Sequence, residues 1–397
     1  MEKRSVKLKE ITSYISRGIT PDYVDEGLCV INQKCVRNNK ISYAPSRCTS
    51  LTKKVPKEKM LKRGDILINS TGTGTLGRVA YKDDDLESTF DGHVTVLRVS
   101  DEINSRYINY YLNELQSQLE NLGLGSTNQL ELYAKEIVKI KIDLPDITIQ
   151  NKIVDIAETY DKQIDNIQNR IDLLFELGET IYKEWFVRFR FPGHKSCKFH
   201  NGIPEDWTVA RVADFGRVET GKTPSMEIEE YYGGDIPFIK TPDMHGNVFV
   251  IETDEKLSEM GSNSQKRKLL PPNSIMVTCI GTGGVVSINP IPAHTNQQIN
   301  SIVLNNIEEL EWLFYTCRSM KTTIEMYGAT GTTMTNLSKG KFEKLKVVKP
   351  SEEIVLKYHD IVGPMIKEIK TLMYMKKALV DQKNLIVPRL ISDRLKV

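Results

Sequence analysis

The chain carries at residues 64–74 the stretch Gly-Asp-Ile-Leu-Ile-Asn-Ser-Thr-Gly-Thr-Gly, in which a run of apolar residues ends in a glycine-rich turn. A second version, Asn-Ser-Ile-Met-Val-Thr-Cys-Ile-Gly-Thr-Gly, occupies residues 273–283, roughly 205 positions later. Short apolar runs bounded by turn residues are typical of buried strands. The stretch therefore predicts a buried strand that enters a tight turn, once in each half of the chain.

The repeat extends outward from this stretch in both directions. Before it, Gly18-Ile19-Thr20-Pro21 matches Gly221-Lys222-Thr223-Pro224. After it come an alternating segment, a helical segment with an aromatic residue and a closing segment that ends in proline; they are His93–Leu97 and Gln298–Ile302, Tyr107 and Trp312, and Leu132–Pro145 and Leu337–Pro350. The order is the same in both halves, which indicates one unit of strands and helices that is built twice.

After each closing proline the apolar residues recur every three or four positions, which predicts a long helix with one apolar seam. We expect the two helices to pack on each other in antiparallel directions, because a parallel pair would force the linker to run back almost fully extended. Gly363-Pro364 should delay or kink the second helix, and Pro388 should end or bend it. The seam of the first helix is formed by Ile153, Ile156, Tyr160, Ile164, Ile167, Ile171, Leu174, Leu177, Ile181 and Trp185, and most matching positions from Tyr358 to Leu390 are apolar.

The expected fold class is therefore α+β. Two mixed, strand-rich α/β units are joined by two long antiparallel coiled-coil helices, which makes a pseudo-two-fold internal repeat. The expected boundaries are 1–145 for the first unit, 146–190 for the first helix, 191–207 for a linker, 208–350 for the second unit and 351–397 for the second helix.

Composition places the chain among soluble globular proteins, with 40% hydrophobic and 27% charged residues among 397. It has no run of 18 apolar residues and no secretory signal at its start, so we expect a cytoplasmic protein without a membrane partner. A net charge of +2 does not indicate nucleic-acid binding, so any DNA-binding surface must be a local patch of basic residues. Candidate basic patches are Lys53, Lys54, Lys57, Lys59, Lys62 and Arg63; Lys266-Arg267-Lys268; and Lys339, Lys341, Lys344, Lys346 and Lys349.

Catalytic motifs are missing from the sequence. Residues 70–78 lack the Gly-Lys-Ser/Thr ending of a phosphate-binding loop, and Pro271-Pro272 lacks the Asn or Asp and the aromatic residue of an adenine methyltransferase. The six cysteines form no metal-binding pair, and His194, Cys197 and His200 supply only three donors, so we expect no metal site. His93 is expected to be a packed or hydrogen-bonded residue and not a catalyst.

The order of these segments resembles the specificity subunits of Type I restriction-modification systems. The likeness covers nearly the whole chain and rests on Gly-x-Thr-Pro near the start of each unit, the strand that runs into Gly72-Thr73-Gly74 or Gly281-Thr282-Gly283, and the long helices. Three further phrases are similar to the family: residues 184–193 (EWFVRFRFPG), 202–207 (GIPEDW) and 293–298 (AHTNQQ).

The resemblance implies that each unit is a target recognition domain that reads one half of a split sequence in double-stranded DNA, while the helices act as a spacer. It also implies that two methyltransferase subunits dock on the helices, that restriction and translocase subunits join them, and that this chain has no catalytic chemistry. S-adenosylmethionine, ATP and Mg would belong to those partners, and this chain would hold no cofactor. Residues 22–60 and 225–268 differ, so we expect two unlike half-sites.

Candidate DNA-binding residues carry forked or paired hydrogen-bonding groups in these unlike loops, or lie in the glycine-rich turns. They are Gln33, Lys34, Arg37, Asn38, Thr71, Thr73 and Arg78 in the first unit, and Lys240, Asp243, His245, Asn247 and Thr282 in the second. Candidate partner-docking residues on the helices are Ile167, Ile171, Leu174, Trp185, Leu372 and Leu379.

Other functions stay open at this point. The chain could be a non-enzymatic coiled-coil adaptor whose units bind proteins, a fragment of a fused methyltransferase, or, more remotely, a hydrolase. The glycine-rich turns could be structural corners only, since glycine supplies the backbone angles that a corner needs.

Overall fold

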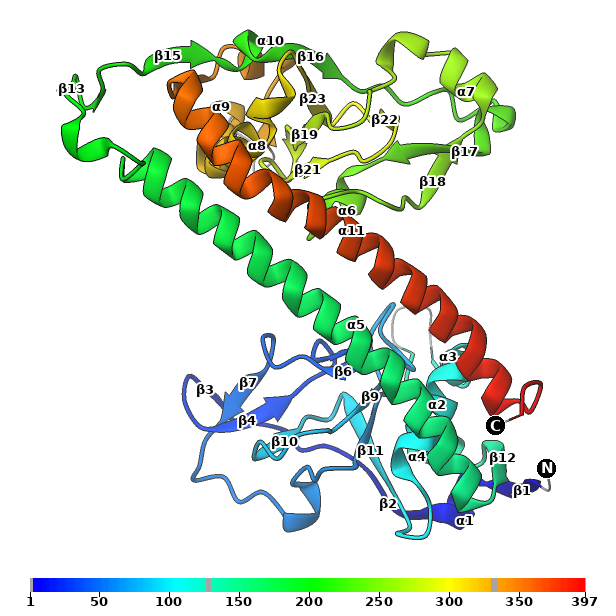
Figure 1. Cartoon of the computed structure of the whole chain (residues 1–397). Coiled ribbons are helices and arrows are strands. Elements are labelled where there is room, and N and C mark those ends of the chain that lie inside the picture. The colour runs from blue at the N-terminus through cyan, green and yellow to red at the C-terminus, as the bar shows by residue number, and fades with distance from the viewer. Residues whose placement is uncertain (1–2, 126–129, 330–334, 397) are drawn as a thin grey trace. The chain divides into compact units, whose positions relative to one another are not determined.

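The computed structural model describes residues 3–125, 130–329 and 335–396. Its contacts divide the chain into unit 1, Met1–Lys162 with Val380–Val397, and unit 2, Gln163–Leu379. Each unit combines one strand-rich domain with segments of two long helices (Figure 1). The α+β class and the internal repeat are thus confirmed.

Unit 1 contains two principal sheets. One has the order β2-β11-β8-β9-β6-β5, the other β10-β4-β7-β3, and β1 pairs separately with β12. The predicted buried strand is β8, whose four residues are all buried. The strands are β1 Lys3–Lys7, β2 Thr12–Arg17, β3 Tyr23–Val24, β4 Leu28–Ile31, β5 Val36–Arg37, β6 Asn39–Ile41, β7 Arg47–Thr49, β8 Ile66–Asn69, β9 Val79–Tyr81, β10 Ser88–Phe90, β11 Val94–Val99 and β12 Lys141–Pro145; the helices are α1 Leu8–Ile11, η1 Lys57–Lys59, α2 Ser105–Glu114, α3 Gln116–Asn121 and α4 Ala134–Ile137.

Unit 2 repeats this plan. Its sheets have the orders β16-β23-β19-β21 and β18-β17-β22, and β15 pairs with β25 as β1 does with β12. The predicted second strand is β19, again fully buried. The strands are β13 Phe199–His200, β14 Ile203–Pro204, β15 Thr208–Arg211, β16 Gly216–Thr220, β17 Tyr232–Ile239, β18 Glu255–Leu257, β19 Ile275–Thr278, β20 Ile280–Gly281, β21 Val286–Ile288, β22 His294–Thr295, β23 Ile299–Leu304, β24 Thr335–Asn336 and β25 Lys346–Lys349; the helices are η3 His194–Ser196, η4 Val212–Asp214, η5 Glu229–Tyr231, α6 Thr241–Met244, α7 Glu259–Asn263, η6 Lys266–Lys268, η7 Ile307–Glu309, α8 Leu310–Ser319, α9 Lys321–Gly328 and α10 Lys339–Glu343.

The long helices are α5, Ile147–Tyr182, which continues into the π-helical turn η2, Lys183–Val187, and α11, Glu352–Ile391. Within unit 2 they run antiparallel, as predicted. Contacts at increasing positions along α5 fall at decreasing positions along α11: Gln168 with Lys376 (2.6 Å), Arg170 with Glu368 (2.8 Å) and Gly178 with Tyr358 (3.1 Å).

The prediction for Gly363-Pro364 is wrong in one respect, because α11 begins at Glu352 and runs through both residues without delay. A proline inside a helix removes one backbone hydrogen bond. Here the flanking side chains of Val362 and Ile366 are buried in the core of unit 2, which offsets that loss. Pro388 lies in the last turn of the helix. In the part of the chain that the structure describes, no helix is long and apolar enough to cross a membrane.

Candidate nucleic-acid interface

In unit 1 the glycine-rich turn lies beside a loop that is distant in sequence. Gln33, which follows β4, lies against Gly72, where the backbone has a φ of +103° and a Cβ would overlap the Gln33 side chain. The backbone oxygen of Gln33 accepts a hydrogen bond from Asn69 Nδ2 (3.0 Å). Two sets of predicted DNA-binding residues therefore form one surface. We call the set Gln33, Thr71–Gly74, Asp91 and His93 the first corner.

Hydrogen bonds connect the side chains of the first corner in series. His93 Nδ1 lies 2.7 Å from Thr71 Oγ1, and Thr71 Oγ1 donates to Gln33 Oε1 at 3.3 Å. The His93 backbone N–H donates to Asp91 Oδ1 at 2.9 Å, which closes an Asx turn just before β11. Burial raises the pKa of Asp91, although the hydrogen bond from His93 opposes that effect. His93 itself is exposed.

Unit 2 builds the same corner with different side chains. Here the Gln298 backbone N–H donates to Asn296 Oδ1 at 3.1 Å, which forms the equivalent Asx turn before β23. Gln298 Oε1 accepts from Asn296 Nδ2 (3.1 Å) and from Thr241 Oγ1 (3.3 Å). The Gln298 amide nitrogen lies near Gly281, which has a φ of +81°. We call the set Thr241, Gly281–Thr282, Asn296 and Gln298 the second corner.

The glycine of each Gly-x-Thr-Pro segment holds its corner in place. A Cβ on Gly18 would overlap the backbone oxygens of Phe90 and Asp91, and a Cβ on Gly221 would overlap those of Thr295 and Asn296. Their amides also bond to matching oxygens, Gly18 to Val94 and Gly221 to Ile299, both at 3.1 Å. Only glycine allows this approach of two backbones, which explains why the segment is repeated.

The other predicted residues of unit 1 are distributed around the first corner. Lys34 and Arg37 are exposed, and Arg37 Nε donates to the Lys34 backbone oxygen. Asn38 has a φ of +50° and its neighbour Asn39 one of +60°, so this pair forms the tight turn of the β5–β6 hairpin. Thr73 is exposed, and the Arg78 guanidinium folds back on the Gly74 oxygen at 2.8 Å.

In unit 2 the structure divides the predicted residues into two groups. Lys240 forms an ion pair with Glu255, and Asp243 accepts the backbone N–H groups of Lys240 (2.7 Å) and Asp254 (3.3 Å). These contacts give Lys240 and Asp243 structural roles. His245, Asn247 and Thr282 are exposed.

Some of the cations in the basic patches form ion pairs with acids nearby, among them Lys339 with Glu343 and Lys349 with Glu309. Lys53 pairs with Asp22, Arg63 with Asp83 and Asp85, and Lys268 with Glu219. Burial lowers the pKa of Lys59. These ion pairs therefore neutralise part of each patch within the chain itself.

Sequence analysis missed Asp91, Asn296 and Gln298 as site residues and predicted His93 to be a packed or hydrogen-bonded residue and not a catalyst. One signal was present, since both halves have Asp or Asn two residues before the residue that opens the alternating strand. That spacing is typical of an Asx turn. The contacts with Gln33 and Thr241, however, join segments that are far apart in sequence.

The predicted docking residues have a different position from the one expected. Ile167, Ile171 and Leu372 are 6%, 7% and 1% exposed in the core of unit 2, and Leu174, Trp185 and Leu379 pack against that core. Side chains buried this deeply offer no surface to a second chain, so an intramolecular role replaces the docking role for the first three. The apolar residues that α5 and α11 leave exposed within unit 2 are Leu173, Leu177, Ile361, Tyr374 and Met375.

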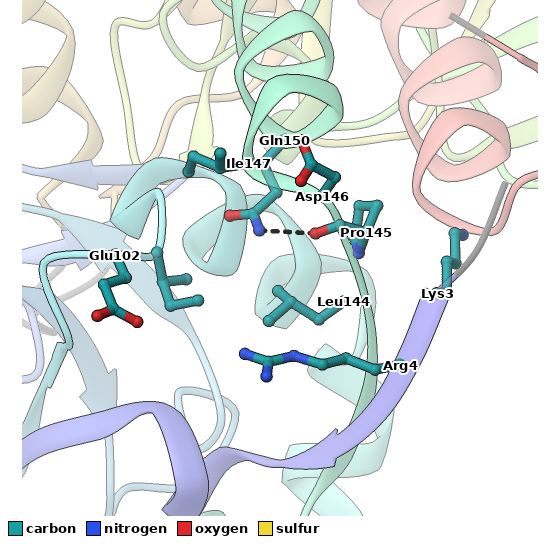
Figure 2. Close-up of a pocket in the computed structure, with 9 residues that line it drawn as sticks. Lys3, Arg4, Glu102, Leu144, Pro145, Asp146, Ile147 and Gln150 are labelled. Carbon is teal, nitrogen blue, oxygen red and sulfur yellow. Dashed lines mark hydrogen bonds between the residues drawn. The ribbon is translucent and has the colours of Figure 1, made fainter.

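A pocket of about 560 Å³ lies at the start of α5 in unit 1 (Figure 2). Three hydrogen bonds hold the helix end of its lining: Gln150 Nε2 donates to the Pro145 oxygen at 2.9 Å, Gln150 Oε1 accepts from the Asn104 N–H, and Asp146 Oδ1 caps α5 at Thr148. These hydrogen bonds therefore stabilise the junction between strand β12 and helix α5. Among the described residues, no group of three or more His, Cys, Asp or Glu could hold a metal ion, and His194 Nδ1 bonds to the Phe191 oxygen.

Comparison with known proteins identifies the class of this duplicated fold. Residues 4–175 and 204–372 match the Type I restriction modification DNA specificity domain, once in each half. The chain belongs to that family. It is therefore a DNA-recognition component without catalysis of its own, and it acts on DNA together with other subunits.

Individual relatives agree with this assignment. The chain is 26% identical over 433 residues to the HindI specificity subunit of Haemophilus influenzae, covering 92% of this chain and 94% of that one. It is 24% identical to the MjaIX specificity subunit of Methanocaldococcus jannaschii, with 98% and 93% covered. The crystal structure of the Type I S subunit from M. genitalium has a similar fold, with a TM-score of 0.62, 13% identity, and 98% and 96% of the two chains covered.

Proposed function

We propose that the chain reads an asymmetric, split DNA sequence, with the first corner at one half-site and the second corner at the other. The observation that carries this proposal is that the two corners share their backbone hydrogen bonds but not their side chains. An equivalent backbone that carries Gln33, Thr71 and His93 in one copy, and Thr241 and Gln298 in the other, would present different groups to base edges.

We further propose that methyltransferase and restriction subunits assemble with this chain and supply S-adenosylmethionine, ATP and Mg, while this chain holds no cofactor. The exposed apolar residues of α5 and α11, Leu173, Leu177, Tyr374 and Met375, are the proposed docking surface, because large apolar side chains gathered on a helix surface commonly mark protein contacts. The proposal places the chain in the cytoplasm, with the DNA that it reads.

The test replaces one unit. Cells that make this chain with a methyltransferase of the same system are compared with cells in which residues 1–145 are replaced. The replacement is the corresponding unit of a family member whose first unit differs in sequence. Sequencing of methylated adenines should give a split motif of which only one half changes. A folded complex that methylates no split motif in either strain would favour the adaptor function instead.

A further inference from the structure

The two corners present hydrogen-bonding groups of opposite sense, and the contacts in each corner fix that sense. In the first corner, the Gln33 Oε1 atom can only accept, so Thr71 Oγ1 donates its proton there. The Thr71 oxygen must then accept from His93 Nδ1, which therefore carries the proton. In a neutral imidazole the other nitrogen is then an acceptor. His93 thus presents Nε2 as an acceptor, and this atom has no hydrogen-bond partner among the described residues.

In the second corner, a backbone hydrogen bond determines which way the Asn296 and Gln298 side-chain amides face. The Gln298 N–H donates to Asn296 Oδ1, so the amide nitrogen of Asn296 faces the Gln298 side chain. That nitrogen is a donor, and the atom of Gln298 that meets it is Oε1, which Thr241 Oγ1 also approaches. The Gln298 Nε2 amide is left as a donor, and no partner for it lies among the described residues.

We propose that His93 and Gln298 are base-reading residues at equivalent positions, with His93 accepting from a base and Gln298 donating to one. This inference rests on the proposed function and deepens it, because it names the chemistry that each corner selects. Acceptance at His93 Nε2 fits the exocyclic amino group of adenine or cytosine. Donation from Gln298 Nε2 fits the major-groove acceptors of guanine, thymine or adenine and leaves out cytosine, which presents only a donor there.

Burial separates the residues that read from those that orient. His93 is exposed and Gln298 half-buried, whereas Asp91 and Asn296 are only 3% and 8% exposed. Asn296 is therefore a positioning residue, which acts through Gln298 without reaching the DNA. The pre-set orientation matters because a side chain whose rotamer is already fixed loses less entropy when it meets a base.

The structure offers two independent ways to reverse the second corner. Gln298→Glu replaces the outward amide by a carboxylate oxygen, which only accepts. Asn296→Asp keeps the bond to the Gln298 N–H but turns an acceptor toward the side chain, so the Gln298 amide must rotate and present Oε1. The fold accommodates this second change, because Asp91 occupies the same position in the first corner.

The experiment selects binding sequences from a random duplex library with the full-length chain. Both Gln298→Glu and Asn296→Asp should exclude guanine and thymine and admit cytosine at one position of one half-site, with adenine tolerated before and after, and leave the other half-site unchanged. His93→Ala should weaken the preference for an amino-bearing base at one position of the other half-site, by up to about tenfold, as expected for one hydrogen bond. Asn305→Asp, at the opposite end of β23, adds the same charge as the two reversing variants. It should lower affinity for all sequences alike.

The outcomes separate the two proposals. If the unmodified chain selects a split motif and both reversing variants select the same motif, the inference about His93 and Gln298 is wrong and the proposed function stands. If the unmodified chain selects no motif, the proposed function itself fails. Thermal unfolding of each variant identifies one that does not fold, and the other reversing variant then decides.

Discussion

The Glu311 carboxylate, on α8, lies 2.7 Å from His359 Nδ1 on α11, and joins the strand-rich domain of unit 2 to its long helix. The matching position in unit 1 is Arg106, which lies 3.6 Å from Glu158 on α5. Each unit therefore places an acid–base side-chain pair between equivalent elements, with the acid on the domain in unit 2 and the base on the domain in unit 1. Both units thus join the domain to the long helix at matching positions, but with the acidic and basic side chains on opposite elements.

The Glu311 junction should depend on pH. Burial raises the pKa of Glu311, although the hydrogen bond with His359 opposes that effect. A raised pKa in the folded state means that this group stabilises the fold below its unfolded pKa, and that the contribution is lost as pH rises through the folded value. Relative to Glu311→Gln, the unmodified chain should therefore lose melting temperature as pH rises above 4.5, the ordinary pKa of a glutamate.

Thermal unfolding of both proteins across that range measures the effect. The exposed Glu325→Gln serves as a control, and its difference from the unmodified chain should not change with pH in this way. A constant difference for Glu311→Gln would contradict the expectation.

Gly221→Ala should destabilise the chain by about 1–3 kcal/mol or more, because the new Cβ would overlap two backbone oxygens that cannot easily move. Gly340→Ala is the matched control. It lies in α10 with no atom within 4 Å of the added Cβ, and alanine favours a helix over glycine by about 1 kcal/mol. Melting temperatures should thus move in opposite directions for the two variants, and equal shifts would show that backbone crowding at Gly221 is not important.

Asp161 ties three elements of unit 1 together. It accepts from Tyr110 on α2 and from Lys383 on α11, both at 2.5 Å. Asp161→Ala leaves a largely buried ammonium group without its carboxylate, which should cost about 1–3 kcal/mol of stability. The exposed Asp155→Ala on the same helix should change stability by less than about 0.5 kcal/mol. Denaturant unfolding measures both, and similar values would argue that the Asp161 contacts contribute little.

The six cysteines should react in two groups of three. Burial raises the pKa of Cys35 and Cys279 to about 11 and that of Cys317 to about 12, so these thiols stay protonated and enclosed at pH 8. The partly exposed thiols are Cys29, Cys48 and Cys197. A thiol reagent should modify these three quickly in the native chain and all six in denaturant. Fast reaction of Cys317 would mean that the core of unit 2 opens readily.

Much of the fold could be predicted because each structural element occurs twice in the sequence with the same spacing of apolar residues. The strands β8 and β19, the aromatic residues of α2 and α8, and the antiparallel helices all follow from periods in the sequence. The helix start at Glu352 was misjudged, because the local cost of Pro364 was weighed without the burial of Val362 and Ile366.

The site was less accessible to sequence reasoning. Loop residues with forked side chains were sensible candidates, yet Lys240 and Asp243 turned out to bond within their own domain. An apolar seam likewise does not tell which partner covers it, and Ile171 and Leu372 are covered by the chain itself. Both answers depend on contacts between distant segments, which a pattern along the chain does not contain.

In each corner, the residue that closes the Asx turn, Asp91 or Asn296, is different from the residue whose side chain points outward, His93 or Gln298. The bond that closes each Asx turn joins a main-chain N–H to the buried Asp91 or Asn296, whereas the side chains at 93 and 298 bond only to other side chains of their corner. A new side chain at either position therefore leaves the backbone hydrogen bond of the Asx turn in place. With His93 and Gln298 as the proposed base-reading residues, a single substitution at either position would change the recognised sequence while the Asx turn persists, so a new DNA target would not have to pass through an unstable intermediate.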